Sequence, residues 1–451
     1  MKSYIAAIDL GTTKVVSLVG EKTESGYKIV AFKETPSKGI MRGEVVNIQD
    51  VLNSLIPTLQ EIKSENDIEI KEVYVGIAGQ NIRCTDEGCK RNRQRPDVLI
   101  NESEVQEMQM EMYKTRVNAG ERILHVIPQS YNIDDHIGMK EARGMAGSQI
   151  EGNYKLFIGR TNSAEHSKSV IARADLKLKE LVLEPVASAL AVLNEEEMEM
   201  GVAMVDIGGG TTDLLVIEDN IIRHTAVIPF GGNSITEDIK QGCGVSSRNA
   251  EQMKIQYGSC VSEYAPENRT VIIPGIGGRE SREISFKVIA SIIEARMAEI
   301  VEAVQYEIDR SGYLDKLNGG IVVTGGGAQL ANLCQFVKYK TGYDTRIASP
   351  NINITFDSCE GVNKPSSSTA VGLVLYGYEC EKFMQEENQK AEKSTIGGTL
   401  FDQEDLEKVE ITATASTEEK RIKKERVAGK TMFNGFREQM RSFFDTGDNE
   451  A

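Results

Sequence analysis

Apolar residues near the start of the chain form two short runs that are separated by a small polar turn. Residues 4–10 are mostly apolar, and the turn Gly-Thr-Thr-Lys leads from them into the run Val-Val-Ser-Leu-Val-Gly. Short apolar runs bounded by turn residues predict buried β-strands. We therefore expect a strand, a tight turn and a second strand here, followed by a helix over residues 48–62.

The same pattern returns in the middle of the chain. Residues 201–220, GVAMVDIGGGTTDLLVIEDN, predict a strand, a Gly-rich turn and a second strand. A third strand is expected over residues 221–229 and a helix over residues 233–241. An internal repeat is the simplest explanation. It predicts two similar α/β halves with room for a ligand between them.

The turns of both repeats carry residues suited to holding a polyphosphate. Asp9 and Asp206 each end a strand and precede glycines and threonines, whose N–H and hydroxyl groups can approach phosphate oxygens closely. Lys14 would supply a positive charge, and Asp213 lies on the second outgoing strand. Carboxylates at both turns would repel a nucleotide, so they indicate Mg²⁺ between them, bound directly or through water.

A third glycine turn, Gly325–Gly327, follows an apolar run and is expected to open a helix that faces phosphate or ribose. One Gly-rich turn alone is more often a plain turn, but three of them, two as repeats with a matching acid, are specific. The chain has no GxxxxGK[ST] loop and no GxGxxG after its first strand. The pattern therefore indicates another class of nucleotide-binding protein.

The last part of the chain changes character after residue 378. Residues 381–429 are polar and poor in large apolar side chains, which predicts a flexible linker. In residues 430–445 apolar side chains recur at helical spacing, with basic residues on the other face, which predicts an amphipathic helix lying on a membrane surface. Docking in a groove of a partner or of the chain's own body is the alternative. The residues expected at the membrane are Lys430, Met432, Phe433, Phe436, Arg437, Met440, Arg441, Phe443 and Phe444.

Composition narrows the function further. The net charge of the 451 residues is −16, which argues against general binding of nucleic acid. The seven cysteines and four histidines are scattered, so neither a disulfide framework nor a metal centre built from them is expected. No signal peptide and no apolar stretch of about 20 residues is present, which favours a cytoplasmic protein. The basic run over residues 89–96 is expected to be a solvated loop, with an acidic partner as the alternative.

Several segments resemble a known superfamily. AIDLGTTK, VDIGGGTTD and VVTGGGAQL resemble the two phosphate motifs and the adenosine motif of the actin, Hsp70 and hexokinase superfamily, and LEPVASALAVL and SSSTAVGLVLYG resemble its two connecting helices. Within it, GIMRGEVVNI, VYVGIAGQNIRC, RILHVIPQSYNID and GVSSRNAEQMKIQYG resemble the bacterial cell-division family FtsA. The resemblance covers residues 1–380, and the tail is a separate match.

The resemblance implies an α/β, actin-like fold of two lobes built on ribonuclease H-like repeats, with an FtsA-type inserted subdomain. The expected parts are a first lobe core (1–83 and 163–195), the inserted subdomain (84–162), a second lobe core (196–234 and 318–380) and an outer second-lobe subdomain (235–317).

Matching motifs also imply roles for individual residues. The phosphate contacts would be Gly11, Thr12, Thr13, Lys14, Gly208, Gly209, Gly210, Thr211 and Thr212. The nucleoside contacts would be Glu251, Lys254, Gly325, Gly326, Gly327 and Ala328, and the Mg²⁺ site Asp9, Asp206 and Asp213. Glu184 would orient water for catalysis. From the residues alone, Glu184 also fits a helix start, and Glu251 with Lys254 also fits an exposed ion pair.

The family resemblance implies an ATP-binding protein with weak or no ATPase activity, which polymerises and tethers the tubulin-like protein FtsZ to the membrane. The FtsZ tail site is expected on residues 235–315. The expected partners are therefore the FtsZ C-terminal peptide, further copies of the chain, an anionic membrane surface and other division proteins, at the cytoplasmic face of the inner membrane at the division site. An FtsA-like pilus-assembly protein that docks on a peptide of a membrane protein is the alternative.

Overall fold

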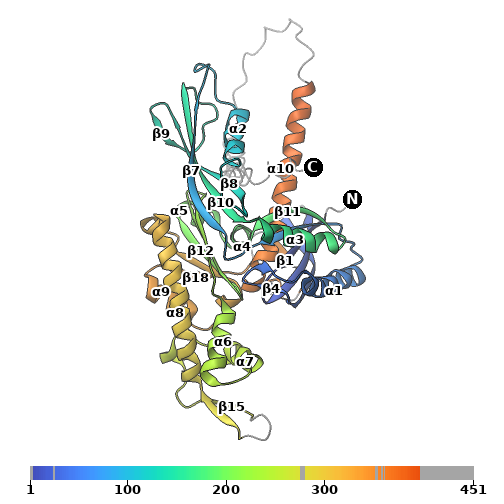
Figure 1. Cartoon of the computed structure of the whole chain (residues 1–451), viewed down its shortest axis with the longest axis vertical. Helices are drawn as coiled ribbons and strands as arrows, with labels where there is room; N and C mark the ends of the chain where they lie inside the picture. Colours follow the sequence, from blue (N-terminus) through green and yellow to red (C-terminus); the bar gives the residue numbers. More distant parts are fainter. Residues whose placement is uncertain are drawn as a thin grey trace, which may run out of the picture.

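The computed structural model describes residues 4–23, 26–274, 280–350, 354–356, 359 and 361–396. The predicted amphipathic helix and most of the predicted linker lie outside these residues. Figure 1 shows a long molecule with two lobes in its middle, the inserted subdomain at one end and the hairpin β15–β16 at the other. In the described part of the chain, no helix is both long and apolar enough to cross a bilayer.

The first lobe is built on a six-stranded sheet with the order β11-β6-β1-β2-β3-β19. Its antiparallel core is β1, β2 and β3, while β6, β11 and β19 add parallel neighbours. The strands are β1 (Tyr4–Leu10), β2 (Lys14–Thr23), β3 (Gly26–Pro36), β6 (Glu72–Ile77), β11 (Lys177–Leu183) and β19 (Ile354–Phe356). One face is covered by α1 (Ile48–Asn66) and α3 (Thr161–Arg173). The predicted strand, turn, strand and helix are thus confirmed.

The second lobe repeats this plan with five strands in the order β14-β13-β12-β17-β18. Again an antiparallel trio is followed by parallel strands. The elements are β12 (Val202–Ile207), β13 (Thr212–Glu218), β14 (Ile221–Ile228), β17 (Ile321–Thr324), β18 (Thr345–Ile347), α5 (Glu195–Met200) and α9 (Leu333–Thr341). The internal repeat predicted from the sequence is therefore present in the fold.

Two helices lie between the sheets and join the lobes. They are α4 (Glu184–Val192) and α10 (Ser368–Ile396), and one apolar cluster contains residues of both helices and of both sheets. At their crossing, a Cβ on Gly372 would overlap the backbone of Ala187. Only glycine therefore lets the two helices approach this closely.

The inserted subdomain is a four-stranded antiparallel sheet with the order β7-β10-β8-β9, covered on one face by α2. Its elements are β7 (Arg83–Asn92), β8 (Glu121–Ile133), β9 (His136–Met139), β10 (Gln149–Arg160) and α2 (Glu102–Met112). The outer part of the second lobe contains α6 (Gly232–Cys243), α7 (Ser247–Tyr257), α8 (Phe286–Ser311), β15 (Thr270–Ile273) and β16 (Arg282–Ser285).

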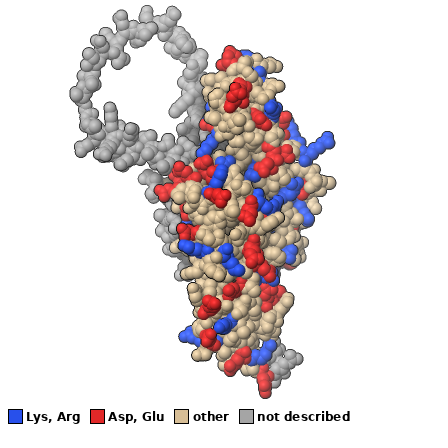
Figure 2. Space-filling view, turned by 90° about the vertical axis from the view of Figure 1, so that its left-hand side faces the viewer, with Lys and Arg blue, Asp and Glu red and all other residues tan. Residues whose placement is uncertain are grey.

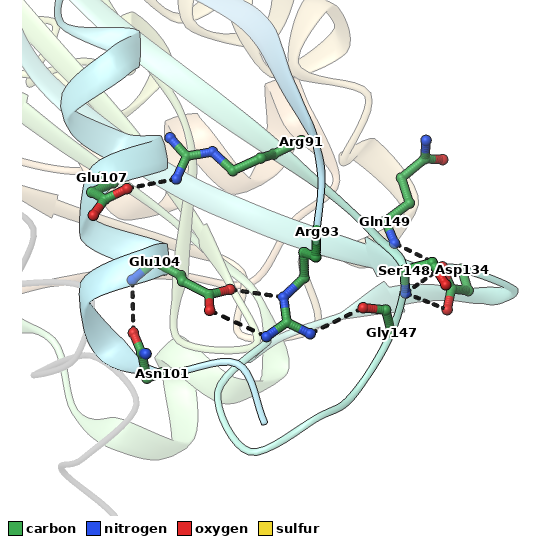
Figure 3. Close-up of polar contacts among 9 residues, drawn as sticks. All are labelled: Arg91, Arg93, Asn101, Glu104, Glu107, Asp134, Gly147, Ser148 and Gln149. Carbon is green, nitrogen blue, oxygen red and sulfur yellow. Dashed lines mark hydrogen bonds and ion pairs between the residues drawn. The ribbon is translucent and has the colours of Figure 1, made fainter. Parts of the chain in front are cut away.

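The basic run over residues 89–96 was expected from the sequence to be a solvated loop, but the structure shows otherwise. Its first part belongs to β7, and two of its arginines face α2 (Figure 3). Arg93 donates two hydrogen bonds to the carboxylate of Glu104 and one to the carbonyl of Gly147. Arg91 pairs with Glu107 at 2.7 Å. The positive charge of this run is balanced by glutamates of α2. The pairing could not be predicted from the sequence, because it forms only when the fold brings the two segments together.

The chain's charges are mixed over its surface. On the face in Figure 2, Lys and Arg side chains are interspersed with Asp and Glu over the described body of the molecule. Exposed charges arranged in this way screen one another and give no single basic stripe on that face.

The C-terminal part of the body differs from the expected division. β19 pairs with β3, and α10 packs on β1, β2 and β6, so both contact the first lobe although residues 318–380 were expected in the second. The reason is the apolar start of α10, which is buried between the sheets. The helix also continues to Ile396, into the predicted linker. Glu, Gln, Lys and Ala favour helix there although apolar residues are few.

Candidate functional site

A cavity of about 550 Å³ lies where the two lobes meet. It is lined by the turns that follow β1, β12 and β17, by the starts of α4, α6 and α10, and by α7. The turns predicted from the sequence to act together are therefore brought around one space. A cavity of this size is typical of a site for a small molecule or cofactor.

The turns of the two repeats touch each other directly. A Cβ on Gly210 would lie 2.6 Å from Oγ1 of Thr12, and one on Gly209 would overlap Oγ1 of Thr13. The glycines of the second lobe are thus required because the threonines of the first lobe occupy the space above them. A ligand held by one turn is necessarily within reach of the other.

The hydroxyl of Thr12 is oriented by a short hairpin, β4 (Ile40–Met41) and β5 (Glu44–Val45). The backbone N–H of Gly43, at the hairpin tip, donates to Oγ1 of Thr12 at 3.1 Å. With this acceptor position filled, the Thr12 hydroxyl proton remains available for an anionic ligand.

Four carboxyl groups converge on the cavity. Asp9 and Asp206 are the last residues but one of β1 and β12, and Asp213 lies on β13. Glu184 begins α4, where Gly76 of β6 leaves room for its side chain. The three aspartates are buried.

The two aspartates of the second lobe, Asp206 and Asp213, differ in the hydrogen bonds that they accept. Oδ2 of Asp206 accepts hydrogen bonds from Ser188 at 2.7 Å and Thr369 at 3.2 Å. Oδ2 of Asp213 accepts from Thr211 at 3.2 Å, while its buried Oδ1 has no hydrogen-bond partner among the described residues. A buried oxygen without a partner costs free energy, so Oδ1 of Asp213 is poised to accept a donor or a cation.

The ionisation of these groups reflects the same crowding. Burial, followed by the charges of Asp206 and Asp9, raises the pKa of Asp213 to about 8. Burial raises the pKa of Asp9 to about 6 against the opposing effect of Lys14. Burial and the neighbouring aspartates raise the pKa of Glu184 well above its usual value. Full ionisation of this group of acids therefore requires added positive charge.

Mg²⁺ fits this requirement with one restriction. Among the described residues, no three Asp, Glu, His or Cys side chains are placed to hold a metal ion by themselves. Of the two arrangements expected from the sequence, the geometry thus favours binding through water or ligand oxygens. Mg²⁺ commonly keeps several waters and takes one or two carboxylates.

The two lysines of the cavity are held by carboxylates. Lys14 pairs with Glu34 at 2.6 Å, and Lys254 pairs with Glu251 at 2.8 Å. Nζ of Lys254 also donates to the carbonyl of Gly232 and to Thr236. The ion pair that was one interpretation of Glu251 and Lys254 is therefore present, and the same two residues also line the cavity.

The third glycine turn packs against the end of β12. Gly325 has φ +88°, and a Cβ there would overlap Oδ1 of Asp206. A short 3-10 helix, Gly326–Gln329, follows in place of the expected α-helix, and α9 begins only at Leu333. Gly325, Gly326 and Gly327 all line the cavity.

Two of the predicted contacts do not reach the cavity wall. The hydroxyl of Thr212 turns away and donates to the carbonyl of Phe230, and Ala328 is fully buried in the second lobe. Alternation along β13 explains the first case, since the adjacent Asp213 lines the cavity and Thr212 therefore points to the opposite side.

Sequence reasoning missed several residues that line or support the cavity. Ser188 and Thr369 lie in the two connecting-helix motifs, so their motifs were visible although their bonds to Asp206 were not. The other missed lining residues include Glu34, Gly43, Asn233, Ile255, Gln256, Leu330, Ala331 and Ser366. Gly43, Ile255, Gln256, Leu330 and Ser366 lie inside recognised motifs without being singled out there. The other three, Glu34, Asn233 and Ala331, reach the cavity because distant segments fold together.

Comparison with known proteins identifies related families. Residues 203–372 match the family "Cell division protein FtsA", and residues 79–158 match "SHS2 domain inserted in FTSA". The chain is 34% identical over 381 residues to the cell division protein FtsA of Pseudomonas aeruginosa, which covers 83% of this chain and 89% of that protein.

Two solved structures share the fold at low identity. The PilM-PilN type IV pilus biogenesis complex matches with a TM-score of 0.58 and 15% identity, over 83% of this chain and 98% of that one. MreB5 of Spiroplasma citri bound to ADP matches with a TM-score of 0.51 and 16% identity, over 85% and 98%. Together with the matched insertion, they confirm the predicted actin-like α/β fold.

Proposed function

This chain belongs to the FtsA family of cell division proteins, and from this premise we propose that it binds ATP with Mg²⁺ between its lobes, polymerises and anchors FtsZ to the membrane. The observation that carries nucleotide binding is the meeting of three glycine turns around one cavity beside Oδ1 of Asp213, which has no partner in the part of the chain that the structure describes. The ADP bound by the structurally similar MreB5 also supports this proposal.

The phosphate groups would be held by both repeats. Backbone N–H groups of residues 11–13 and 209–211 would donate to phosphate oxygens, together with the hydroxyl of Thr12. Asp9, Asp206 and Asp213 would hold Mg²⁺, in part through water. The ion would supply positive charge shared between these carboxylates and the phosphate oxygens.

The nucleoside would lie beside α7 and the third glycine turn. Lys254 and Glu251 would face the ribose, while the exposed side chain of Ile255 and the neighbouring Leu330 offer apolar surface to the base. Gly326, whose nearest neighbour to an added Cβ is 4.0 Å away, leaves space at this end.

We expect little or no ATP hydrolysis. Glu184 lines the cavity as the group that would orient water, but burial and the neighbouring aspartates raise its pKa, which favours its protonated form. A protonated carboxyl cannot accept a proton from water. Nucleotide is therefore proposed to control assembly more than to be turned over.

The C-terminal residues 430–445 are proposed to form the membrane contact. A single amphipathic helix binds weakly, whereas joining many copies raises the effective concentration of helices at the surface. ATP-dependent polymerisation would thereby strengthen attachment at the cytoplasmic face of the inner membrane. The 34% identity to a cell division protein supports this role over pilus assembly, since the similarity to PilM-PilN is only one of fold.

A pelleting experiment tests the proposal. Full-length protein is mixed with vesicles containing anionic lipid, with FtsZ or its C-terminal peptide, and with or without ATP and Mg²⁺. We expect more protein and more FtsZ on vesicles when ATP and Mg²⁺ are present. The chain lacking residues 430–451 should still bind nucleotide but stay in the supernatant.

Three results would contradict the proposal. The absence of nucleotide affinity in Mg²⁺ would remove its central part. Equal vesicle binding by monomer and polymer would remove the coupling, and unchanged recruitment after the deletion would favour the pilus-type alternative.

A further inference from the structure

The charges around the cavity are strongly unbalanced. Among the described residues, two ammonium groups line it, those of Lys14 and Lys254. The carboxyl groups that line it are those of Asp9, Glu34, Glu184, Asp206, Asp213 and Glu251. Because each lysine already pairs with one of these carboxylates, neither ammonium is uncommitted when a polyphosphate arrives.

The pairing of Lys14 with Glu34 follows from the register of β2 and β3. Lys14 lies opposite Pro36, and Val16 lies opposite Glu34, so Glu34 is the diagonal neighbour of Lys14. Long side chains can reach a diagonal neighbour on the same face of a sheet. The two groups meet at 2.6 Å, and the Glu34 side chain is half exposed.

The ammonium of Lys14 is drawn towards Glu34 and Phe32 on β3. This ammonium lies 5.9 Å from the centre of the ring of Phe32, which stands two residues before Glu34 on β3. The side chain therefore extends along β3 from its place at the end of the phosphate turn. Glu34 pairs with this ammonium and adds a negative charge of its own to the cavity wall.

We propose that Glu34 makes nucleotide binding depend on Mg²⁺ by competing with the phosphate groups for Lys14. The inference rests on the proposed function, since it assumes that a nucleoside polyphosphate occupies this cavity. Without a divalent cation, the polyphosphate meets a surplus of carboxylates and a lysine that is already neutralised. With Mg²⁺ bound, the ion supplies positive charge to the phosphate groups. The pairing of Lys14 with Glu34 then has a smaller effect on the affinity for the nucleotide.

The substitution Glu34→Gln separates these two situations. It keeps the size of the side chain, removes its charge and frees the ammonium of Lys14. Binding of ATP and of adenosine is measured by titration calorimetry on the full chain, in EDTA and in Mg²⁺. We expect the Kd for ATP in EDTA to fall about three- to tenfold, as for a partly exposed charge acting at close range. In Mg²⁺ it should change less than about twofold, and the Kd for adenosine should not change.

Glu65→Gln provides the matched control. Glu65 of α1 pairs with Lys33 of β3 at 2.7 Å, is also largely exposed, and does not line the cavity. This variant carries the same change of net charge and should leave the Kd for ATP unchanged in both buffers. Thermal unfolding without nucleotide checks that both variants are folded.

The possible outcomes are distinct. Weaker ATP binding by Glu34→Gln in EDTA, or an unchanged ratio of the Kd values in EDTA and Mg²⁺, would overturn the inference and leave the proposed function intact. An equal effect of Glu65→Gln would also overturn it, because the cause would then be net charge. If the wild-type chain bound no ATP even in Mg²⁺, the proposed function would fail and this inference with it.

Discussion

Asp206 and Asp213 are direct partners in the antiparallel pair of β12 and β13, and both are buried. Like charges placed opposite each other in a sheet are destabilising, and burial makes the repulsion stronger. Asp206 accepts hydrogen bonds from two hydroxyl groups, while one oxygen of Asp213 finds no partner in the described ranges of the chain. The free chain therefore contains a local instability that a bound cation would remove.

The first prediction concerns pH. The pKa of Asp213 is about 8 in the folded chain and near 3.8 when it is unfolded, so between these values the folded state binds more protons. The contribution of Asp213 to the free energy of unfolding is therefore full below pH 4 and is lost as the pH rises towards 8. Relative to wild type, Asp213→Asn should gain stability by up to about 1.4 kcal/mol per pH unit across this range. Urea unfolding in EDTA at several pH values measures it, and a constant difference would exclude Asp213 as the cause.

The second prediction concerns Mg²⁺ with nucleotide. If Mg²⁺ relieves the repulsion between Asp206 and Asp213, MgADP should raise the melting temperature of the wild-type chain more than that of Asp213→Asn. A nucleotide stabilises the folded state more when it binds that state more tightly. The variant should bind MgADP less tightly because it lacks one of the carboxylates proposed to hold Mg²⁺. Ser64→Ala, at an exposed hydroxyl of α1, serves as the control and should respond as wild type does. Equal shifts in all three proteins would show that Asp213 takes no part.

The third prediction concerns the contact between the phosphate turns. Gly209→Ala would push its Cβ into Oγ1 of Thr13 and should destabilise the free chain by about 1–3 kcal/mol, as overpacking does. Gly326→Ala, with no atom closer than 4.0 Å to the new Cβ, should be tolerated by the fold.

A second substitution tests the cause. Thr13→Ala removes Oγ1 and should restore part of the stability lost in Gly209→Ala, which denaturant unfolding of the double variant would reveal. Failure to recover any stability would mean that the collision with Thr13 is not responsible.

The fourth prediction concerns the inserted subdomain. Only 5% of the Arg93 side chain is exposed, and it makes three hydrogen bonds, so Arg93→Ala should cost about 2–4 kcal/mol by leaving Glu104 and the Gly147 carbonyl unpaired. Arg91→Ala is the matched control and should cost less than about 1 kcal/mol, because its pair with Glu107 is exposed. Chemical denaturation compares them, and adding Glu104→Gln should recover part of the Arg93 loss. Similar costs for both arginines would contradict this account.

The two repeats could be predicted from the sequence because their signals are local. Apolar runs, turn residues and glycines each act within a few positions, and together they located the turns that line the cavity. The acids Asp9, Asp206 and Asp213 were found for the same reason, since each stands next to a recognisable turn.

Other features depended on contacts between distant segments. Glu34 reaches Lys14 through the register of two strands, and Arg93 meets Glu104 only after α2 folds onto its sheet. The resemblance of residues 366–377 to a connecting helix indicated the start of α10 but not which sheet it contacts. Thr212 was misplaced because adjacent strand residues face opposite sides, which a turn motif does not specify.

The length of α10 has a mechanical consequence. Thr369, in its first turn, is bonded to Asp206 at the cavity, and the same unbroken helix of 29 residues ends at Ile396, beyond the first-lobe sheet (Figure 1). At 1.5 Å per residue its length is about 43 Å, so a tilt of about 5° at Thr369 would displace Ile396 by about 4 Å. The helix thus connects a hydroxyl that is bonded to a carboxylate of the cavity, near its N-terminal end, with residues 397–451, which follow its C-terminal end. A rearrangement around Asp206 that tilted the helix by this angle would move the start of that segment by about 4 Å.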